Sequence, residues 1–150
     1  MIEVIPARPQ HVGPIATRMR AIDMIECAAF GYTPKAALRS GLMGSTLVWT
    51  ALIDHRPEAM FGVSPISVVE GRGRPWLLMT PVAEHQRKAL VRLGTIYTAA
   101  MHTHYGALSN WIHADNSRSI RWLSRLGYAV GAVDAIAGHP MRPFYRQRTT

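Results

Sequence analysis

The segment Leu108–Tyr128 constrains the fold more than any other part of the chain, because it reads as a strand, a helix and a second strand start. Its first six residues, Leu108–His113, form a short apolar run typical of a buried strand. Asp115 or Asn116 then offers a side-chain oxygen that can cap a helix. Gly127 supplies the left-handed residue that commonly ends a helix. A sheet with a helix packed on it is therefore expected here.

Length and composition favour one folded domain. The 150 residues fit a single domain, 1–150, with an ordinary core. Hydrophobic residues make up 48% of the chain and charged residues 17%, which favours a globule over a disordered chain. We find no apolar run near the roughly 18–20 residues that cross a bilayer, and no signal-peptide core. The single cysteine, Cys27, fits a reducing compartment, so a cytoplasmic location is expected.

Hydrophobic periodicity divides the chain into alternating elements. The pattern predicts strands at Ile2–Ile5, Thr46–Ile53, Ala59–Val68, Pro75–Thr80 and Leu108–His113, and a final hairpin from Tyr128–Val133 and Met141–Tyr145. It predicts helices at Val12–Ile22, from Asp23, from Thr33-Pro34, at Glu84–Met101 and from Asn116 to Gly127. This order predicts an α+β fold with a mixed sheet, in which an antiparallel meander gains a parallel neighbour through a crossover helix.

That element order resembles the GNAT N-acyltransferase superfamily over essentially the whole chain, and its most specific part is Asn116 at a helix start followed by Leu126-Gly127-Tyr128 at the helix end. The resemblance implies that the fourth and fifth strands splay apart and hold acetyl-CoA between them. It implies that Leu78, Met79 and Thr80 present backbone groups to the pantetheine arm, and that Asn116 contacts the same arm.

The loop after the fourth strand departs from that pattern. In the superfamily, glycines there let the backbone close on the pyrophosphate, whereas Thr80–Lys88 contains no glycine. Glu84 stabilises a helix start but repels phosphate. The resemblance therefore leaves Val82 to Arg87 to cap the pyrophosphate, with Arg87 and Lys88 as compensating charge. We expect an altered pyrophosphate site.

The acid and base of an acyl transfer are also not obvious. Many members of the superfamily place a proton-donating tyrosine four residues before the helix-ending glycine, and that position is Leu123 here. Glu26, His113 and the pair His102/His104 are the candidate general bases. Glu26 has capping-box spacing from Asp23, so a capping role is its alternative. His113 ends the fifth strand, and imidazole titrates near neutral pH.

Three other features are assigned structural roles. His102 and His104 lack companion cysteines or acids at ligand spacing, so no metal site is expected. Gly71-Arg72-Gly73 precedes a strand instead of opening a helix, which indicates a hairpin turn and not a phosphate loop. Cys27 lies on an apolar helix and is expected to be an inert core thiol.

The net charge of +8 has two interpretations. It can attract a polyanion or an acidic ligand, or it can reflect a host bias toward arginine. The pattern puts Arg118, Arg121 and Arg125 on one helix face, and three more arginines follow in the C-terminal tail, at positions 142, 146 and 148. These residues form either a solvated face or a surface for an anion, such as nucleic acid or the 3′-phosphate of CoA.

Within the superfamily, the chain looks most like small GNAT-like proteins of tailed phages. The features that carry this resemblance are Pro75–Thr80, a following helix without a glycine loop, Asn110-Trp111-Ile112, and a leucine at position 123. The resemblance implies a phage or prophage origin, with the protein in the host cytoplasm or in the virion. It leaves open whether the chain is an enzyme.

Three functions therefore compete. The first is an acetyl-CoA-dependent N-acetyltransferase acting on an unidentified amine. The second is a non-catalytic virion or assembly protein, a basic protein with virion proteins or DNA as partners. The third, motivated by the net charge and the arginine face, is a basic domain that associates with nucleic acid. In each case the apolar final hairpin could pair two copies into a homodimer.

Overall fold

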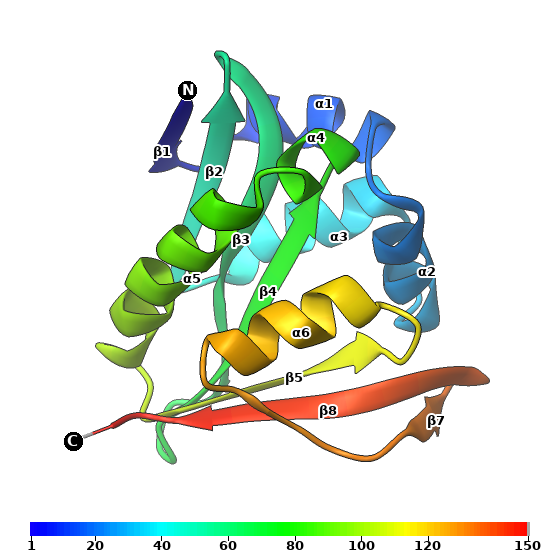
Figure 1. Ribbon diagram of the computed structural model, residues 1–150, viewed down its shortest axis with the longest axis vertical. Helices are drawn as coiled ribbons and strands as arrows, with labels where there is room; N and C mark the ends of the chain where they lie inside the picture. Colours follow the sequence, from blue (N-terminus) through cyan, green and yellow to red (C-terminus); the bar gives the residue numbers. More distant parts are fainter. Residues whose placement is uncertain (150) are drawn as a thin grey trace.

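The computed structural model describes residues 1–149, which form one α+β unit (Figure 1). The strands are β1 (Ile2–Pro6), β2 (Leu47–Ile53), β3 (Arg56–Ser67), β4 (Arg72–Met79), β5 (Ala107–His113), β6 (Ala129–Val130), β7 (Asp134–Ile136) and β8 (His139–Gln147). The helices are a 3-10 turn at Pro9–His11, α1 (Val12–Thr17), α2 (Ala21–Ala29), α3 (Pro34–Gly44), α4 (Pro81–Glu84), α5 (Arg87–His102) and α6 (Ser117–Arg125). None of the helices in this part of the chain has the length and hydropathy to cross a bilayer.

The strands form one mixed sheet in the order β1-β2-β3-β4-β5-β8-β6, with β7 beside β8. Every pairing is antiparallel except that of β4 with β5. Those two strands pair only through Arg72 with Ala107 and Gly73 with Leu108, and beyond these residues they diverge. The predicted mixed sheet with a splay between the fourth and fifth strands is thus confirmed.

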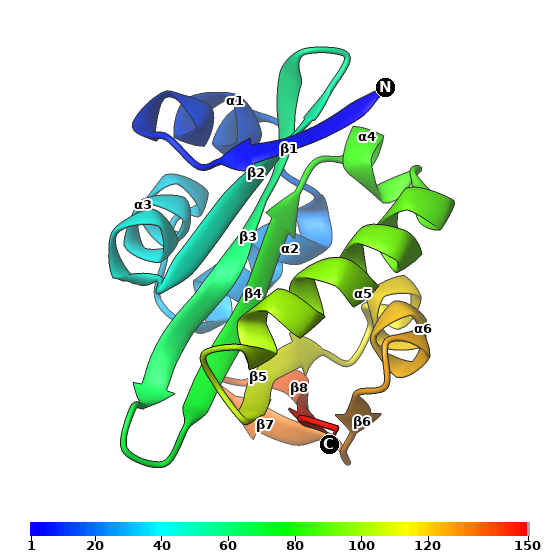
Figure 2. The same cartoon turned by 90° about the vertical axis from the view of Figure 1, so that its left-hand side faces the viewer.

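Helices cover both faces of the sheet (Figure 2). Helices α1, α2 and α3 pack on one face, where Ile15, Leu38 and Met60 are completely buried. Helices α5 and α6 cover the other face, over a core that includes Leu108 and Leu123. Because side chains alternate along a strand, β4 contributes to both cores. Trp76 and Leu78 point toward α1–α3, and Leu77 and Met79 point toward α5.

Two predicted helices are broken in the structure. The expected helix Val12–Ile22 divides into α1 and α2 around Arg18–Arg20, since the backbone N–H of Arg20 leaves the helix to bond the carbonyl of Met79 at 2.9 Å. The expected helix Glu84–Met101 divides into α4 and α5 at His85-Gln86. In both places a contact or turn near the end of β4 overrides a continuous helical periodicity.

The helix-end predictions have mixed outcomes. Thr33 caps α3, its hydroxyl accepting the N–H of Ala36 at 3.1 Å, and Gly127 ends α6 with φ at +90°, as predicted. Asn116 is the first residue before α6, but its side chain makes no capping bond. The capping box at Asp23 and Glu26 was wrong, since α2 already begins at Ala21.

The final hairpin is rearranged and anchored by the tail arginines. It consists of β7 and β8, turning at Ala137 and Gly138, while Tyr128–Val133 adds only the two-residue β6. Each tail arginine donates to a backbone carbonyl: Arg142 to Gly131 (2.8 Å), Arg146 to Leu126 (3.0 Å) and Arg148 to His102 (2.6 Å). Two of these carbonyls lie at helix C-termini, where a cation is favoured. Arg146 and Arg148 therefore fasten the C-terminal end of β8 to α6 and α5, and Arg142 fastens the same strand to the segment after β6.

Glycine at position 62 allows β2 and β3 to approach closely. A Cβ there would lie 2.2 Å from the carbonyl oxygen of Leu47, a backbone atom that cannot swing away. We expect Gly62→Ala to lower the free energy of unfolding by about 1–3 kcal/mol, the usual cost of overpacking. Chemical denaturation measures the change. Gly13→Ala, where nothing lies within 4 Å, is the control, and equal stability of both variants would contradict this packing.

Candidate functional site

A cleft of about 640 Å³ runs through the sheet where β4 and β5 diverge. Residues from both faces line it: α2 and α3 on one side, and α5 and α6 on the other. Its edges are the two strands themselves, through residues 74–78 of β4 and 110–112 of β5. The backbone N–H and carbonyl groups at those edges have no neighbouring strand to bond, so each needs another hydrogen-bond partner. Those partners, and the groups left without one, define the site.

The edge of β4 that faces the cleft follows from its pairing with β3. Thr80 donates its N–H to the carbonyl of Glu58 at 2.9 Å, and the register places Leu78 opposite Met60. Hydrogen-bonded pairs alternate in an antiparallel ladder, so positions 76, 78 and 80 bond β3. Positions 75, 77 and 79 therefore turn their backbone groups toward β5.

Leu77 is the open position on this edge. On one side of it, the carbonyl of Pro75 accepts the side-chain N–H of Asn110 at 2.8 Å. On the other side, Met79 donates its N–H to Asp23 at 3.0 Å and accepts the N–H of Arg20 at 2.9 Å. Within residues 1–149, no partner faces the N–H and carbonyl of Leu77, and its side chain lines the cleft.

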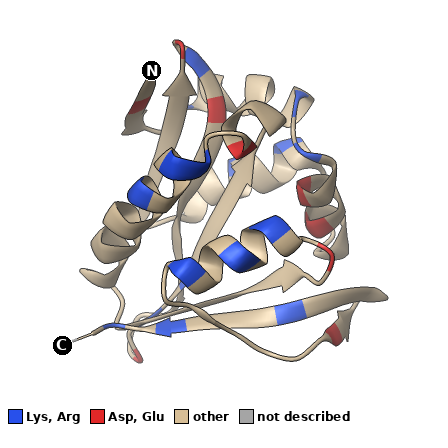
Figure 3. Cartoon of the chain, viewed as in Figure 1, with Lys and Arg blue, Asp and Glu red and all other residues tan. Residues whose placement is uncertain are grey.

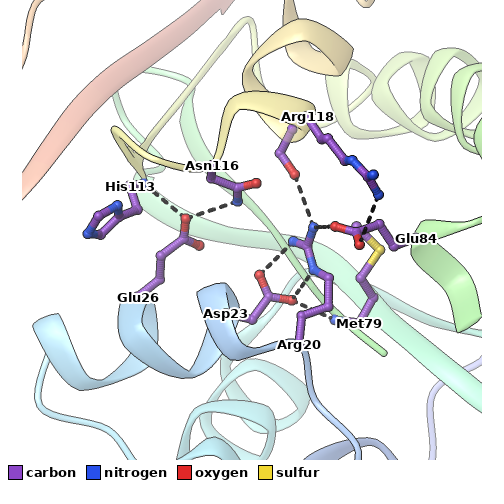
Figure 4. A network of polar contacts seen from close by, with 9 residues as sticks. Arg20, Asp23, Glu26, Met79, Glu84, His113, Asn116 and Arg118 are labelled. Atoms are coloured by element: carbon purple, nitrogen blue, oxygen red, sulfur yellow. Dashed lines mark hydrogen bonds and ion pairs between the residues drawn. The ribbon is translucent and has the colours of Figure 1, made fainter. Parts of the chain in front are cut away.

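Two carboxylates of α2 hold the ends of the diverging strands (Figure 4). Asp23 bonds the N–H of Met79 on β4. One turn later, Glu26 accepts the N–H of His113 on β5 at 2.9 Å and the side-chain N–H of Asn116 at 3.2 Å. Helix α2 therefore spans the wide end of the splay, with one acid on each strand.

Arg20 joins three helices through a buried polar network. Its guanidinium is 5% exposed and bonds both oxygens of Asp23, at 3.1 and 2.7 Å. It also bonds Glu84 of α4 at 2.7 Å and Ser119 of α6 at 3.4 Å. Arg118 reaches the other oxygen of Glu84 at 3.4 Å. The charge of Glu84, which the sequence suggested would repel phosphate, is thus balanced by two arginines.

Burial determines the protonation of both α2 acids. It raises the pKa of Asp23, although Arg20 and the N–H of Met79 act in the opposite direction. Burial also raises the pKa of Glu26 to about 7, with the negative charge of Asp23 adding to the effect and the N–H of His113 opposing it. Only one oxygen of Glu26 is hydrogen-bonded among the described residues, and Glu26 lines the cleft. Glu26 is therefore placed to exchange a proton near neutral pH.

His113 lies differently from the sequence interpretation. Its backbone N–H belongs to the site, but its ring is buried outside the cleft lining, where Nδ1 accepts the N–H of Asp115 at 3.1 Å. The ring of His139 is its aromatic neighbour, at 6.2 Å between centroids. The geometry therefore favours Glu26 over His113 as the base.

The predicted cofactor residues are only partly gathered at the cleft. Leu78 lines it with its side chain, but its backbone bonds β3, and the backbone N–H groups of Met79 and Thr80 are also engaged. Asn116 lines the cleft, and its contact with the pantetheine arm stays a prediction. Val82, Arg87 and Lys88 are exposed around the starts of α4 and α5 and do not line it. Leu77, Arg20 and Asp23 were missed, since only the strand register and a long-range contact identify them.

Three other candidate groups are buried, although each of them also contributes to the lining of the cleft. Leu123 is buried in the core beneath α6. Tyr128 is buried as well, its hydroxyl 3.3 Å from that of Thr98, and burial raises the pKa of the Tyr128 phenol. Burial raises the pKa of Cys27 to about 12, which keeps its thiol protonated. The described residues contain no group of three His, Cys, Asp or Glu able to hold a metal ion.

Comparison with solved structures identifies the fold. An aminoglycoside acetyltransferase, AAC(6′)-Ib, in complex with coenzyme A and kanamycin matches with a TM-score of 0.68 at 12% identity, over 99% of this chain and 95% of that one. Spermidine N-acetyltransferase from Vibrio cholerae, in complex with CoA and spermine, matches with a TM-score of 0.71 at 9% identity, over 97% and 95%. A ribosomal-protein-S5-alanine acetyltransferase from Vibrio fischeri matches with 0.66 at 12%, over 97% and 92%.

The fold is therefore that of the GNAT N-acetyltransferases, as the sequence resemblance implied. No protein-family profile and no curated sequence matches the chain. The phage relationship, the virion or DNA partners and the homodimer gain no support from these comparisons and stay predictions.

The buried ion pair of Arg20 and Asp23 gives a stability prediction. Asp23→Asn keeps the shape but leaves Arg20 with a weaker partner and the N–H of Met79 with a neutral acceptor. Breaking a buried pair by changing one partner typically costs about 3–5 kcal/mol, so a loss near the lower end is expected in chemical denaturation. Asp54→Asn, which changes an exposed pair with the N-terminus, is the control. A similar stability for both variants would contradict the role of the network.

Proposed function

We propose that this protein is an acyl-CoA-dependent N-acyltransferase in which Glu26 serves as the general base. The observation that carries the proposal is that one cleft brings together an open strand edge at Leu77 and the carboxylate of Glu26. The structural neighbours are described as acetyltransferases in complex with CoA and amines, which supports the same assignment.

The open edge of β4 fits the amide-bearing arm of CoA. Leu77 offers one donor and one acceptor to an extended ligand, as a strand edge does to an added strand. Flanking positions on that edge are occupied by Asn110 on one side and Asp23 with Arg20 on the other, so the arm would bond at Leu77. The carbonyl oxygen of the Asn116 side chain also remains unbonded among the described residues.

The start of α5 supports binding of the phosphates. This helix has 16 residues, and its first N–H groups, at Arg87, Lys88 and Ala89, have no helical partner. Arg87 and Lys88 add positive charge at the same end, where the helix dipole also favours an anion. Figure 3 shows positive residues here and along α6. These groups replace the glycine loop that the sequence lacks.

The residues of the cleft give an acyl-transfer mechanism. Acetyl-CoA, when bound, supplies an electrophilic thioester carbonyl. Glu26 removes a proton from the ammonium group of the acceptor, for which a pKa near the working pH is best suited, and the free amine then attacks the carbonyl. The N–H groups of His113 and Asn116 hold one oxygen of Glu26 and leave the other for the amine. As the C–N bond forms and the C–S bond breaks, the CoA thiolate takes its proton from water, because Leu123 has no proton to give.

Isothermal titration calorimetry with acetyl-CoA and free CoA tests the proposal. Micromolar binding is expected for the wild type. Among backbone groups, Leu77→Pro removes only the N–H that faces the cleft and leaves every hydrogen bond between β3 and β4 in place. The natural proline at position 75 faces the same way. We expect an affinity loss of about 5- to 10-fold, the equivalent of one hydrogen bond of about 1 kcal/mol.

Leu77→Ala is the matched control for that variant, because it shortens the same side chain and keeps the N–H. It should bind CoA more tightly than Leu77→Pro. Equal affinity of the two variants would remove Leu77 from the site, and a wild type that binds neither acetyl-CoA nor CoA would overturn the acyltransferase assignment.

Glu26→Gln gives a pH-dependent prediction. A base must be ionised, so kcat/KM of the wild type should rise with pH through about 7, and the variant should lose that inflection with most of the activity. A raised carboxyl pKa also means that ionisation destabilises the fold. The wild type should therefore lose stability between about pH 4.5 and 7, on the order of 3 kcal/mol, and the variant should not.

Denaturation curves at pH 5 and pH 8 measure the second effect independently of activity. A wild type and a Glu26→Gln variant with the same pH dependence of stability would show that Glu26 titrates normally.

A further inference from the structure

The half of the cleft that faces α2 and α3 has aromatic walls. Phe30 and Tyr32, just beyond α2, line it and are each 45% exposed, although aromatic rings are usually covered. Trp76 of β4 and Trp111 of β5 line it from the sheet. Gly41 of α3 leaves room for the ring of Trp76, because a Cβ at position 41 would lie 2.4 Å from that ring. The indole N–H is held by Ser45 at 2.8 Å.

Arg74 is the unengaged cation of this half. Its side chain is exposed, lines the cleft, and within residues 1–149 makes neither a hydrogen bond nor an ion pair. It shares the face of β4 that carries Trp76 and Leu78, because alternate residues of a strand point the same way. A guanidinium at the rim of a cleft is suited to a carboxylate, which it can bind through two parallel bonds.

The negative charge of this half is limited to one group. Asp23 is buried and bonded on both oxygens by Arg20, which leaves Glu26 as the acid able to meet an ammonium group. A polyamine or an aminoglycoside needs several such groups, and the net charge of +8 disfavours a polycation further. The charges of the cleft therefore suit a ligand with one cationic and one anionic end.

The two charged groups lie at opposite ends of the aromatic walls. Glu26 bonds the backbone at His113, whereas Arg74 lies one residue beyond Gly73, which pairs with Leu108 at the narrow end of the splay. Five residues of β5 separate Leu108 from His113, so the two charged groups start about four residues of strand apart, or about 13 Å at the usual rise, before the side chains reach inward. An α-amino acid is too short to bridge that span with its amine on Glu26 and its carboxylate on Arg74.

From this arrangement we propose that the acceptor is a primary amine with an aromatic body and a carboxylate at the end remote from the amine. The amine meets Glu26, the ring lies between Phe30, Tyr32, Trp76 and Trp111, and the carboxylate pairs with Arg74. The proposal rests on the acyltransferase function for the fate of the amine. The binding of the ligand does not depend on that chemistry.

Three benzylamines that differ only at the para position test the proposal: 4-(aminomethyl)benzoate, 4-methylbenzylamine and 1,4-bis(aminomethyl)benzene. Calorimetry gives their affinities, and release of CoA thiol from acetyl-CoA gives their kcat/KM values. The carboxylate should bind at least 10-fold more tightly than the methyl compound, and the diamine should bind most weakly. Arg74→Gln should remove the preference for the carboxylate and leave the methyl compound unchanged.

Arg72→Gln is the matched control. Arg72 lies two residues earlier on the same strand, pairs with Glu70 and does not line the cleft, so this variant should keep the preference. Equal affinities for the three amines, tighter binding of the diamine, or a preference that survives Arg74→Gln would overturn the proposal.

The two readouts separate this inference from the proposed function. Binding that prefers the carboxylate through Arg74 without release of CoA thiol would uphold the acceptor site and refute the transferase. Thiol release with all three amines at equal kcat/KM would do the reverse.

Discussion

Two carboxylates one turn apart on α2 keep β4 and β5 from closing on each other. Asp23 satisfies the N–H of Met79 on one strand, and Glu26 satisfies the N–H of His113 on the other. Without these acceptors, both N–H groups would be left unpaired at the wide end of the splay, at a cost of about 1–3 kcal/mol for each one buried. The cleft, the open edge at Leu77 and the position of Glu26 all depend on α2 lying across this gap.

The same arrangement explains why the site carries so much buried charge. A carboxylate that bonds a strand end from inside the protein must leave water, and Arg20 offsets that cost for Asp23 with a two-bond ion pair. Burial raises the pKa of both acids, and Glu26, which has no such cation in direct contact, reaches about 7. The start of α2 thus carries an ion pair that contacts β4, and one turn later a titratable carboxyl that contacts β5.

The fold could be predicted from sequence because its signals are local. Hydrophobic periodicity and end signals such as Thr33-Pro34 and Gly127 identified the elements and their order, and that order identified the mixed sheet. The site was less accessible. Leu77 and Leu78 are equivalent in the sequence, and only the ladder with β3 decides which backbone faces the cleft. The spacing of Asp23 and Glu26 is that of a capping box, but their hydrogen-bond partners, Met79 and His113, lie 56 and 87 residues further along the chain.

The ring of Trp76 occupies the space that a side chain at position 41 would need, and the hydroxyl of Ser45 accepts the indole N–H. Helix α3 and strand β4 are therefore tightly packed at this point. The width of this part of the cleft is consequently set by the lack of a Cβ atom at Gly41. Among related sequences, any residue larger than glycine at this position must displace the tryptophan. Such a change would alter the shape of this part of the cleft while the acid on α2 and the strand edge stay in place, so the ligands that fit would change without any change at Glu26 or Leu77.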